Sequence, residues 1–273
     1  MPGAYGIALD GPWDDAEGFL QPVPADWPRY ELLAREGNAV VAAARVGPAK
    51  ALLGPPSGGS ILVDREQRQI VVTSSPLRTP AELIHPTLAH AAAIVAWWSG
   101  HESFHAGGFI VDGGAWGVVA TQGGGKSSTL ARLAGAGVPI VADDLVVVAA
   151  GSVFVGPRAL DLRSDAARQL HVGAALGGTG ARERWRLELG PCPVTVPLRG
   201  WFVLEWGEKV GARRLGGGEL LQMLGAQRAV NLPPVDPALL IDLASLPAWS
   251  VERPLALESL PHVAARVLEL ASG

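Results

Sequence analysis

The side chains best suited to chemistry gather in the run VVATQGGGKSSTL, from Val118 to Leu130. The candidates for nucleotide binding are Gly123, Gly124, Gly125, Lys126, Ser127 and Ser128. Backbone N–H groups of consecutive glycines can turn toward an anion, a lysine ammonium can reach the β- and γ-phosphates, and a serine hydroxyl can bind Mg²⁺. The run therefore predicts a loop that binds the phosphates of a nucleotide such as ATP.

Such a loop needs a strand before it and a helix after it. The apolar run from Trp116 to Ala120 is typical of a buried strand, and the residues from Ser127 have helical spacing with a stop at Gly135 or Gly137. This is the context of a Walker A motif, G-x-x-x-x-G-K-[ST], which the chain leaves only at Ala120. The alternative is a flexible Gly/Ser loop that contains a lysine by chance, and the position between two elements disfavours it.

A second chemical feature is the pair Asp143 and Asp144 in GVPIVADDLVVV, between two apolar runs. Adjacent carboxylates in such a place are costly unless they face a cation. We expect Asp143 to bind Mg²⁺ together with Ser127, and Asp144 to accept a proton from an attacking hydroxyl, although these two roles are interchangeable at this stage. A tight turn between strands is the alternative reading.

His105 is the third candidate for a catalytic role. The sequence from His105 to the glycine loop predicts a hairpin whose turn is VDGG, and that hairpin would return His105 to the neighbourhood of Lys126. The spacing alone is equally consistent with a packed or surface histidine.

The run from His105 to Asp144 resembles the catalytic core of the HPr kinase/phosphorylase family, which shows a histidine, two strands, a glycine loop ending in Gly-Lys-Ser, a helix and then ADD. The resemblance implies a carboxykinase-like P-loop fold, with Lys126 on the phosphates, Ser127 at the metal, Asp143 and Asp144 in metal binding and base catalysis, and His105 beside them. Three features differ from the family. Ala120 stands where the family has the first loop glycine, the segment associated with dephosphorylation is not found after the core, and the N-terminal region does not resemble the family's regulatory domain. The chain looks closer to shorter HPr-kinase-like proteins of ribosomal peptide pathways, some of which phosphorylate a serine of a precursor peptide.

Arginines supply further candidate contacts. In GARERWRLELGP, Arg182, Arg184 and Arg186 alternate, so on a strand they would share one face and suit polyphosphate or an acidic peptide. LDLRS is similar to an acidic-x-Arg element of the same family, which places Asp161 and Arg163 near the site. We expect Arg163, Arg184 and Arg186 to contact phosphate or substrate; a solvated edge strand is the alternative.

The predicted fold class is α/β, with a β-rich N-terminal lobe at residues 1–79 and an HPr-kinase-like P-loop kinase domain at residues 80–273. SILVDREQRQIVVTS predicts a hairpin, AVVAAARV a strand, and Pro80 to about Ser99 a helix. Strands and helices then alternate, as in an α/β domain. Further helices are expected at Ser164–Leu170, Glu219–Leu224, Pro237–Leu246 and Leu260–Leu270.

Composition narrows the partners. The 273 residues carry a net charge of −4, without a basic patch for nucleic acid. The apolar run TLAHAAAIVAWWSG is too short to span a bilayer, so no membrane segment is expected. One cysteine and the lack of a recognisable signal peptide favour the cytoplasm, and homo-oligomer formation is left open.

The function expected from these residues is transfer of the γ-phosphoryl group of ATP to a hydroxyl, first of all a Ser or Thr of a peptide or small protein. A small-molecule kinase for a sugar or an amino acid is the second hypothesis. A non-catalytic, nucleotide-binding regulatory protein is the third, and it is favoured only by Ala120 and by the loose match beyond Asp144.

Overall fold

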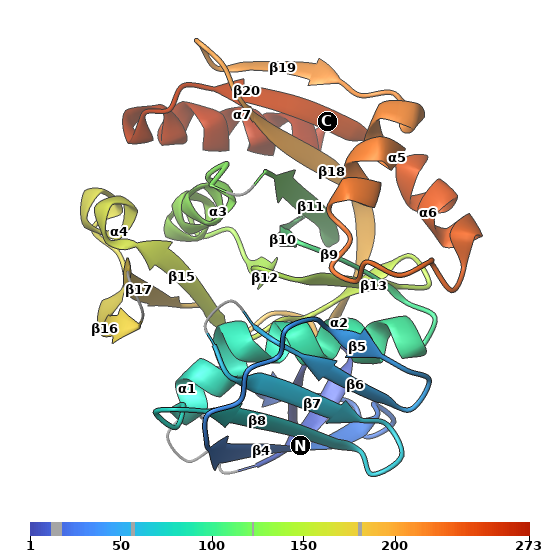
Figure 1. Cartoon of the computed structure of the whole chain (residues 1–273). Coiled ribbons are helices and arrows are strands. Elements are labelled where there is room, and N and C mark those ends of the chain that lie inside the picture. Colours follow the sequence, from blue (N-terminus) through green and yellow to red (C-terminus); the bar gives the residue numbers. More distant parts are fainter. Residues whose placement is uncertain (12–17, 56–57, 122, 180–181) are drawn as a thin grey trace.

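The computed structural model describes residues 1–11, 18–55, 58–121, 123–179 and 182–273, with the backbone alone for residues 177–179 and 182. The fold is α/β with mixed sheets (Figure 1), as the sequence predicts.

The N-terminal region forms the first sheet, with strand order β3-β1-β2-β4-β8-β7-β6-β5. Its strands are β1 (Pro2–Ala4), β2 (Ile7–Asp10), β3 (Gln21–Pro22), β4 (Arg29–Glu36), β5 (Arg45–Val46), β6 (Lys50–Leu53), β7 (Ser60–Asp64) and β8 (Gln69–Ser74). The hairpin β7–β8 confirms the one predicted there. The strand expected at AVVAAARV is mostly absent, because only Arg45–Val46 and a single bridge at Val40 pair, and alanine has little preference for strands.

The helix expected from Pro80 to Ser99 is interrupted. It consists of α1 (Pro80–Glu82), the π-helical turn η2 (Leu83–Thr87) and α2 (Leu88–Trp98). His85 inside η2 has extended backbone angles, φ −143° and ψ 125°. Proline at position 86 explains the break, since the residue before a proline is pushed out of the helical region. The break turns the His85 side chain in a direction that a regular helix would not give it.

The second sheet carries the glycine loop, with strand order β12-β10-β11-β18-β14-β13-β9 and with β20 between β18 and β19. Its strands are β9 (Glu102–Phe104), β10 (Ala106–Val111), β11 (Gly114–Ala120), β12 (Ile140–Ala142), β13 (Val146–Ala149), β14 (Ser152–Phe154), β18 (Thr195–Trp206), β19 (Gly211–Arg214) and β20 (Ala248–Arg253). The predicted hairpin is confirmed as β10–β11. Asp112 and Gly113 at its turn both have positive φ, as a type I′ turn requires.

A third sheet, with order β15-β17-β16, stands beside the loop. It consists of β15 (Ala159–Arg163), β16 (Ala174–Thr179) and β17 (Arg182–Glu188). The remaining helices are α3 (Lys126–Gly135), α4 (Ser164–Leu170), α5 (Gly217–Ala226), α6 (Pro237–Ala244), the short turn η3 (Leu257–Ser259) and α7 (Leu260–Ser272). The four later helices predicted from the sequence are thus present as α4, α5, α6 and α7.

Two faces of the second sheet are buried by different elements. Trp201 and Phe202 are neighbours on β18, both fully buried, and they point into separate hydrophobic clusters. One cluster joins the sheet to α2, α5 and α6, and the other joins it to α3, α4 and α7 (Figure 1). Burial on both faces fixes the central strand β18 and its parallel neighbour β11, whose end carries the loop.

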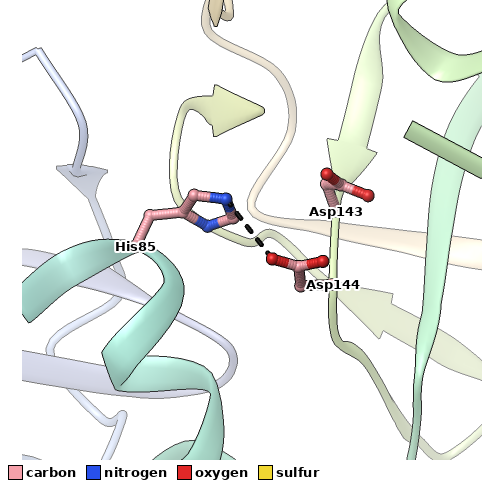
Figure 2. Close-up of side chains that lie close together, drawn as sticks. All are labelled: His85, Asp143 and Asp144. Carbon is pink, nitrogen blue, oxygen red and sulfur yellow. Dashed lines mark ion pairs between the residues drawn. The ribbon is translucent and has the colours of Figure 1, made fainter. Parts of the chain in front are cut away.

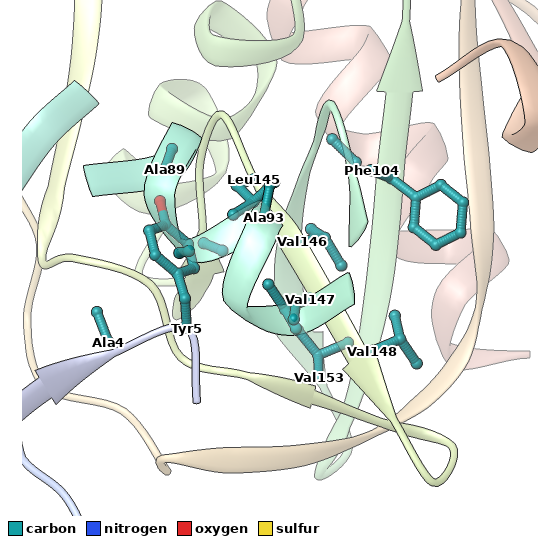
Figure 3. Packing of buried hydrophobic residues seen from close by; sticks show 14 of the residues in the cluster. Ala4, Tyr5, Ala89, Ala93, Phe104, Leu145, Val146, Val147, Val148 and Val153 are labelled. Carbon is teal, nitrogen blue, oxygen red and sulfur yellow. The ribbon is translucent and has the colours of Figure 1, made fainter. Parts of the chain in front are cut away.

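The core continues from the first sheet into the second. Figure 3 shows Ala4 and Tyr5 packed with Ala89 and Ala93 of α2 and with the valines of β13. The phenol of Tyr5 donates a hydrogen bond to the backbone carbonyl of Asp143 (3.1 Å). The N-terminal sheet therefore supports the candidate site directly, and a division of the chain at residues 79 and 80 stays a prediction.

In the described ranges, no helix has the length and apolar character needed to cross a membrane.

Candidate active site

The glycine loop joins β11 to α3, the strand–loop–helix order that the sequence predicts. Gly123 and Gly125 have φ of 78° and 75°, a region that favours glycine. Ala120 is the last residue of β11 and pairs with Leu204 of β18, so its backbone is an ordinary strand backbone. Alanine is therefore accommodated at the position where a Walker A motif has its first glycine. Gln122, inside the loop, lies outside the described residues.

Arg253, which no sequence pattern singles out, contacts the backbone of the glycine loop. Arg253 ends β20, is 2% exposed, and donates from Nη2 to the carbonyl of Gly124 (2.9 Å). Its guanidinium lies 4.1 Å from the centre of the Trp206 ring, and burial lowers its pKa to about 10, so it stays charged at neutral pH. A Cβ atom on Gly125 would come within 1.5 Å of Nη2. Both the φ of Gly125 and the contact with Arg253 thus require glycine.

Ser127 and Asp143 meet where α3 begins. The Ser127 hydroxyl donates to Oδ2 of Asp143 (3.0 Å), and Asp143, after the end of β12, is 1% exposed. Burial, and next the charge of Asp144, raise the pKa of Asp143 to about 6, while Lys126 and His85 oppose the rise. The raised pKa means that the buried carboxylate would be stabilised by a nearby cation. The Ser127 hydroxyl and the Asp143 carboxylate together offer the oxygen ligands that Mg²⁺ prefers.

Asp144 differs from its neighbour in exposure and in charge environment. Its side chain is 39% exposed and lines a cleft, and its backbone has φ of 65°, strained for a residue other than glycine. Burial acts to raise the pKa of this carboxyl, but the positive charges of His85, Lys126, Arg184 and His105 outweigh it, so the pKa is lowered. Asp144 is therefore ionised at neutral pH and open to a ligand.

His85, which no sequence pattern singles out, lies beside the carboxylates of Asp144 and Asp161. Its Nε2 lies 3.5 Å from Oδ2 of Asp144 and 4.0 Å from Oδ2 of Asp161. Figure 2 shows the ring directed from η2 toward Asp144, with a dashed line for this ion pair and with Asp143 next to Asp144. The only local signal is a histidine before proline in an otherwise apolar helical run.

His105 lies where the sequence predicted. It stands directly before β10, is exposed, and lines the same cleft as Lys126, Ser128 and Asp144. Desolvation and the charge of Lys126 lower the pKa of His105, while a hydrogen bond to the backbone of Asp144 and the charge of that residue act in the opposite direction. The imidazole is thus held beside both the lysine and the carboxylate.

The arginines divide into two environments. Arg163 of β15 and Arg184 of β17 face each other across the ladder, and both are exposed in the cleft. Arg186 is 4% exposed and bound internally: it holds Asp161 through Nε (2.8 Å) and Nη2 (3.0 Å), and donates to the carbonyls of Ala81 and His85. The expectation that Arg186 contacts a ligand is therefore corrected, because its donors already hold Asp161 and η2. The side chain of Arg182 lies outside the described residues.

The cleft that these residues line has a volume of about 1040 Å³. Beside the loop, it contains the exposed apolar side chains of Trp206 (42% exposed) and Leu255 (81% exposed). The cleft therefore combines the polar glycine loop and its lysine with apolar surface, the mixture found in ligand sites.

Comparison with known proteins leaves the family open. No family model matches the chain, and neither does any curated protein. Among solved structures, the HPr(Ser) kinase/phosphatase from Coxiella burnetii is similar over 63% of this chain and 98% of its own, with 13% identity and a TM-score of 0.29. A TM-score this low does not establish a shared fold, so functional assignment depends on the geometry of the site.

Proposed function

We propose that this protein is a phosphotransferase that moves the γ-phosphoryl group of ATP to a hydroxyl. The observation that carries the proposal is the convergence of Lys126, the Ser127–Asp143 pair and the accessible carboxylate of Asp144 on one cleft. Such a set supplies positioning and charge stabilisation, which are the main requirements of phosphoryl transfer.

The phosphates would bind at the loop. Gly123 to Ser128 line the cleft where α3 begins, which is the positive end of the helix dipole, and Lys126 adds a full charge. Ser127 and Asp143 would hold Mg²⁺, which would neutralise part of the negative charge of the phosphates. The apolar surface at Trp206 is the part of the cleft best suited to stack against the base.

Asp144 is the proposed base. The acceptor oxygen attacks the γ-phosphorus, and the bond between the γ-phosphorus and the β–γ bridging oxygen breaks, so that ADP leaves. The proton of the acceptor hydroxyl passes to a carboxylate oxygen of Asp144. The exposure of Asp144 and the burial of Asp143 support this division of roles. His105, beside Asp144 and Lys126, would orient the carboxylate.

We propose a Ser or Thr of a peptide or small protein as the acceptor. The cleft volume of about 1040 Å³ is at the upper end of small-ligand pockets, so a nucleotide leaves room for a chain segment. Arg163 and Arg184 are exposed in it and would attract acidic residues of such a segment. The resemblance to kinases of ribosomal peptide pathways favours the same acceptor class.

Mass spectrometry tests the reaction. The protein is incubated with Mg-ATP and short peptides encoded beside its own gene, with Lys126→Ala and Asp144→Asn as variants. We expect one added phosphate on a Ser or Thr with wild type, none with either variant, and retained ATP binding by Asp144→Asn. ATP consumption that rises with a small metabolite, without peptide phosphorylation, would replace the peptide by a small-molecule acceptor. Absence of ATP turnover under every condition would refute the proposal.

A further inference from the structure

His85 is a buried polar side chain whose ring has no hydrogen bond. It is 1% exposed, and neither Nδ1 nor Nε2 has a hydrogen-bond partner among the described residues. A buried polar group without a partner has lost its hydrogen bonds to water, so native structures seldom leave one in that state.

The backbone around His85 is fixed in a way that aims the ring. Its φ and ψ are extended within a helical turn, and its carbonyl accepts a hydrogen bond from Nη2 of Arg186 (2.7 Å). Arg186 is in turn held by Asp161 on the neighbouring strand. The buried ion pair of Arg186 and Asp161 therefore anchors η2, and the His85 ring points toward the carboxylate of Asp144 (Figure 2).

The carboxylates of Asp143 and Asp144 lie close to the His85 ring, and they repel each other unless a positive charge lies between them. One ligand atom each from His85, Asp143 and Asp144 can be chosen so that all three lie within 4.8 Å of one another. Asp143, which is 1% exposed, and its neighbour Asp144 are two adjacent carboxylates, and Nε2 of His85 lies 3.5 Å from Oδ2 of Asp144. A single cation at the centre of these atoms would satisfy the ring nitrogen and both carboxylates at once.

We propose that His85, Asp143 and Asp144 form a site for a divalent first-row transition metal, such as Mn²⁺, with Nε2 of His85 as its nitrogen ligand. Magnesium prefers oxygen ligands only, whereas imidazole nitrogen favours transition metals. With metal–ligand lengths of about 2.1 Å, the 3.5 Å separation of Nε2 and Oδ2 corresponds to an angle of about 115° at the ion, which suits two ligands of one metal.

The site shares Asp143 with the proposed Mg²⁺–nucleotide site and Asp144 with the proposed catalytic base, but it does not depend on a nucleotide. Every ligand comes from the protein, and the position of His85 is set by η2 and Arg186, away from the glycine loop. The inference therefore goes beyond the proposed function. A protein that binds no ATP can still contain this metal site, and a kinase that uses only oxygen ligands would lack it.

The test is pulsed electron paramagnetic resonance of Mn²⁺ bound to the nucleotide-free protein. We expect ¹⁴N coupling from an imidazole in wild type, and tighter binding of Mn²⁺ than of Mg²⁺. His85→Gln should remove the ¹⁴N signal and weaken Mn²⁺ binding by about 10- to 100-fold. His101→Gln makes the same chemical change at a ring packed on Phe154, and it should retain both signal and affinity.

Absence of ¹⁴N coupling in wild type would overturn the proposal, as would coupling that persists in folded His85→Gln. Circular dichroism checks the fold of each variant. If His85→Gln does not fold, the pair His105→Gln and His90→Gln decides. Coupling that survives in both supports His85 as the ligand, and coupling lost in either assigns the nitrogen elsewhere. Binding of Mg-ATP is measured separately, so failure of the metal site and failure of the proposed function are distinguishable.

Discussion

Replacement of Asp143 by asparagine should stabilise the metal-free protein at neutral pH. Burial and the charge of Asp144 raise the pKa of Asp143 from 3.8 to about 6. Because the pKa is higher in the folded chain than in the unfolded chain, the folded protein binds more protons between these values. The free energy of unfolding therefore falls as the pH rises from about 4 to about 6, and it stays reduced above that range.

The size of this effect follows from the shift. At 1.36 kcal/mol per pKa unit, the raised pKa of Asp143 lowers the free energy of unfolding by about 3 kcal/mol at pH 7.5, by roughly half as much at pH 5 and by less than about 1 kcal/mol at pH 4. Asparagine lacks the charge and can still accept the hydrogen bond from Ser127. Asp143→Asn should therefore raise the free energy of unfolding by up to these amounts, with a gain that shrinks toward acid pH.

Urea unfolding in the presence of EDTA, at pH 7.5 and pH 4, measures the difference. Asp112→Asn is the control, because Asp112 is exposed in a turn with positive φ that asparagine also tolerates; it should change stability by less than about 0.5 kcal/mol. Divalent metal should then stabilise wild type and leave Asp143→Asn almost unaffected. If Asp143→Asn is less stable than wild type at pH 7.5 without metal, Asp143 is already satisfied by protein groups and the reasoning is wrong.

Three further changes test individual contacts. Gly125→Ala should lower the free energy of unfolding by about 1–2 kcal/mol for the left-handed backbone alone, displace Arg253 and abolish ATP binding. Gly135→Ala is the control and should be neutral, because an added Cβ there meets nothing. Urea unfolding compares the stability of the two variants, and calorimetry compares their ATP binding. Arg186→Ala should cost about 3–5 kcal/mol in urea unfolding, because it leaves Asp161 buried without its partner. Arg184→Ala, on the same face of β17 but exposed, should change stability little and weaken binding of ATP or of the acceptor peptide; equal losses of stability for both arginines would contradict the division between them.

The glycine loop and the hairpin before it could be predicted because their signals are local. A type I′ turn at VDGG, an apolar strand and a glycine run before a lysine each restrict the backbone within a few residues. These restrictions bring His105 to the cleft. The continuous apolar runs on either side of Asp143 and Asp144 form β12 and β13, and the turn between them places the carboxylates beside the loop.

His85 and Arg253 could not be predicted because their contacts join distant segments. His85 reaches Asp144 only through the helix break at η2, and nothing near Arg253 indicates that it will lie beneath a glycine loop from another part of the sheet. Arg184 and Arg186 show that the strand pattern alone does not predict which side chains are exposed. Alternation on β17 puts both on one face, but η2 packs over Arg186 and leaves Arg184 open, and that packing is tertiary information.

Isothermal titration calorimetry of the metal-free protein with Mg-ATP at pH 7.5 tests the central claim most directly. The account predicts saturable binding of one nucleotide by wild type. Lys126→Ala should weaken it by roughly 10- to 100-fold or more, since a charge-assisted hydrogen bond contributes about 1.5–3 kcal/mol. Lys50→Ala, which removes a lysine paired with Asp64 on the first sheet, should bind as wild type does. No binding by wild type to any Mg-nucleoside triphosphate, or equal binding by wild type and Lys126→Ala, would contradict the account.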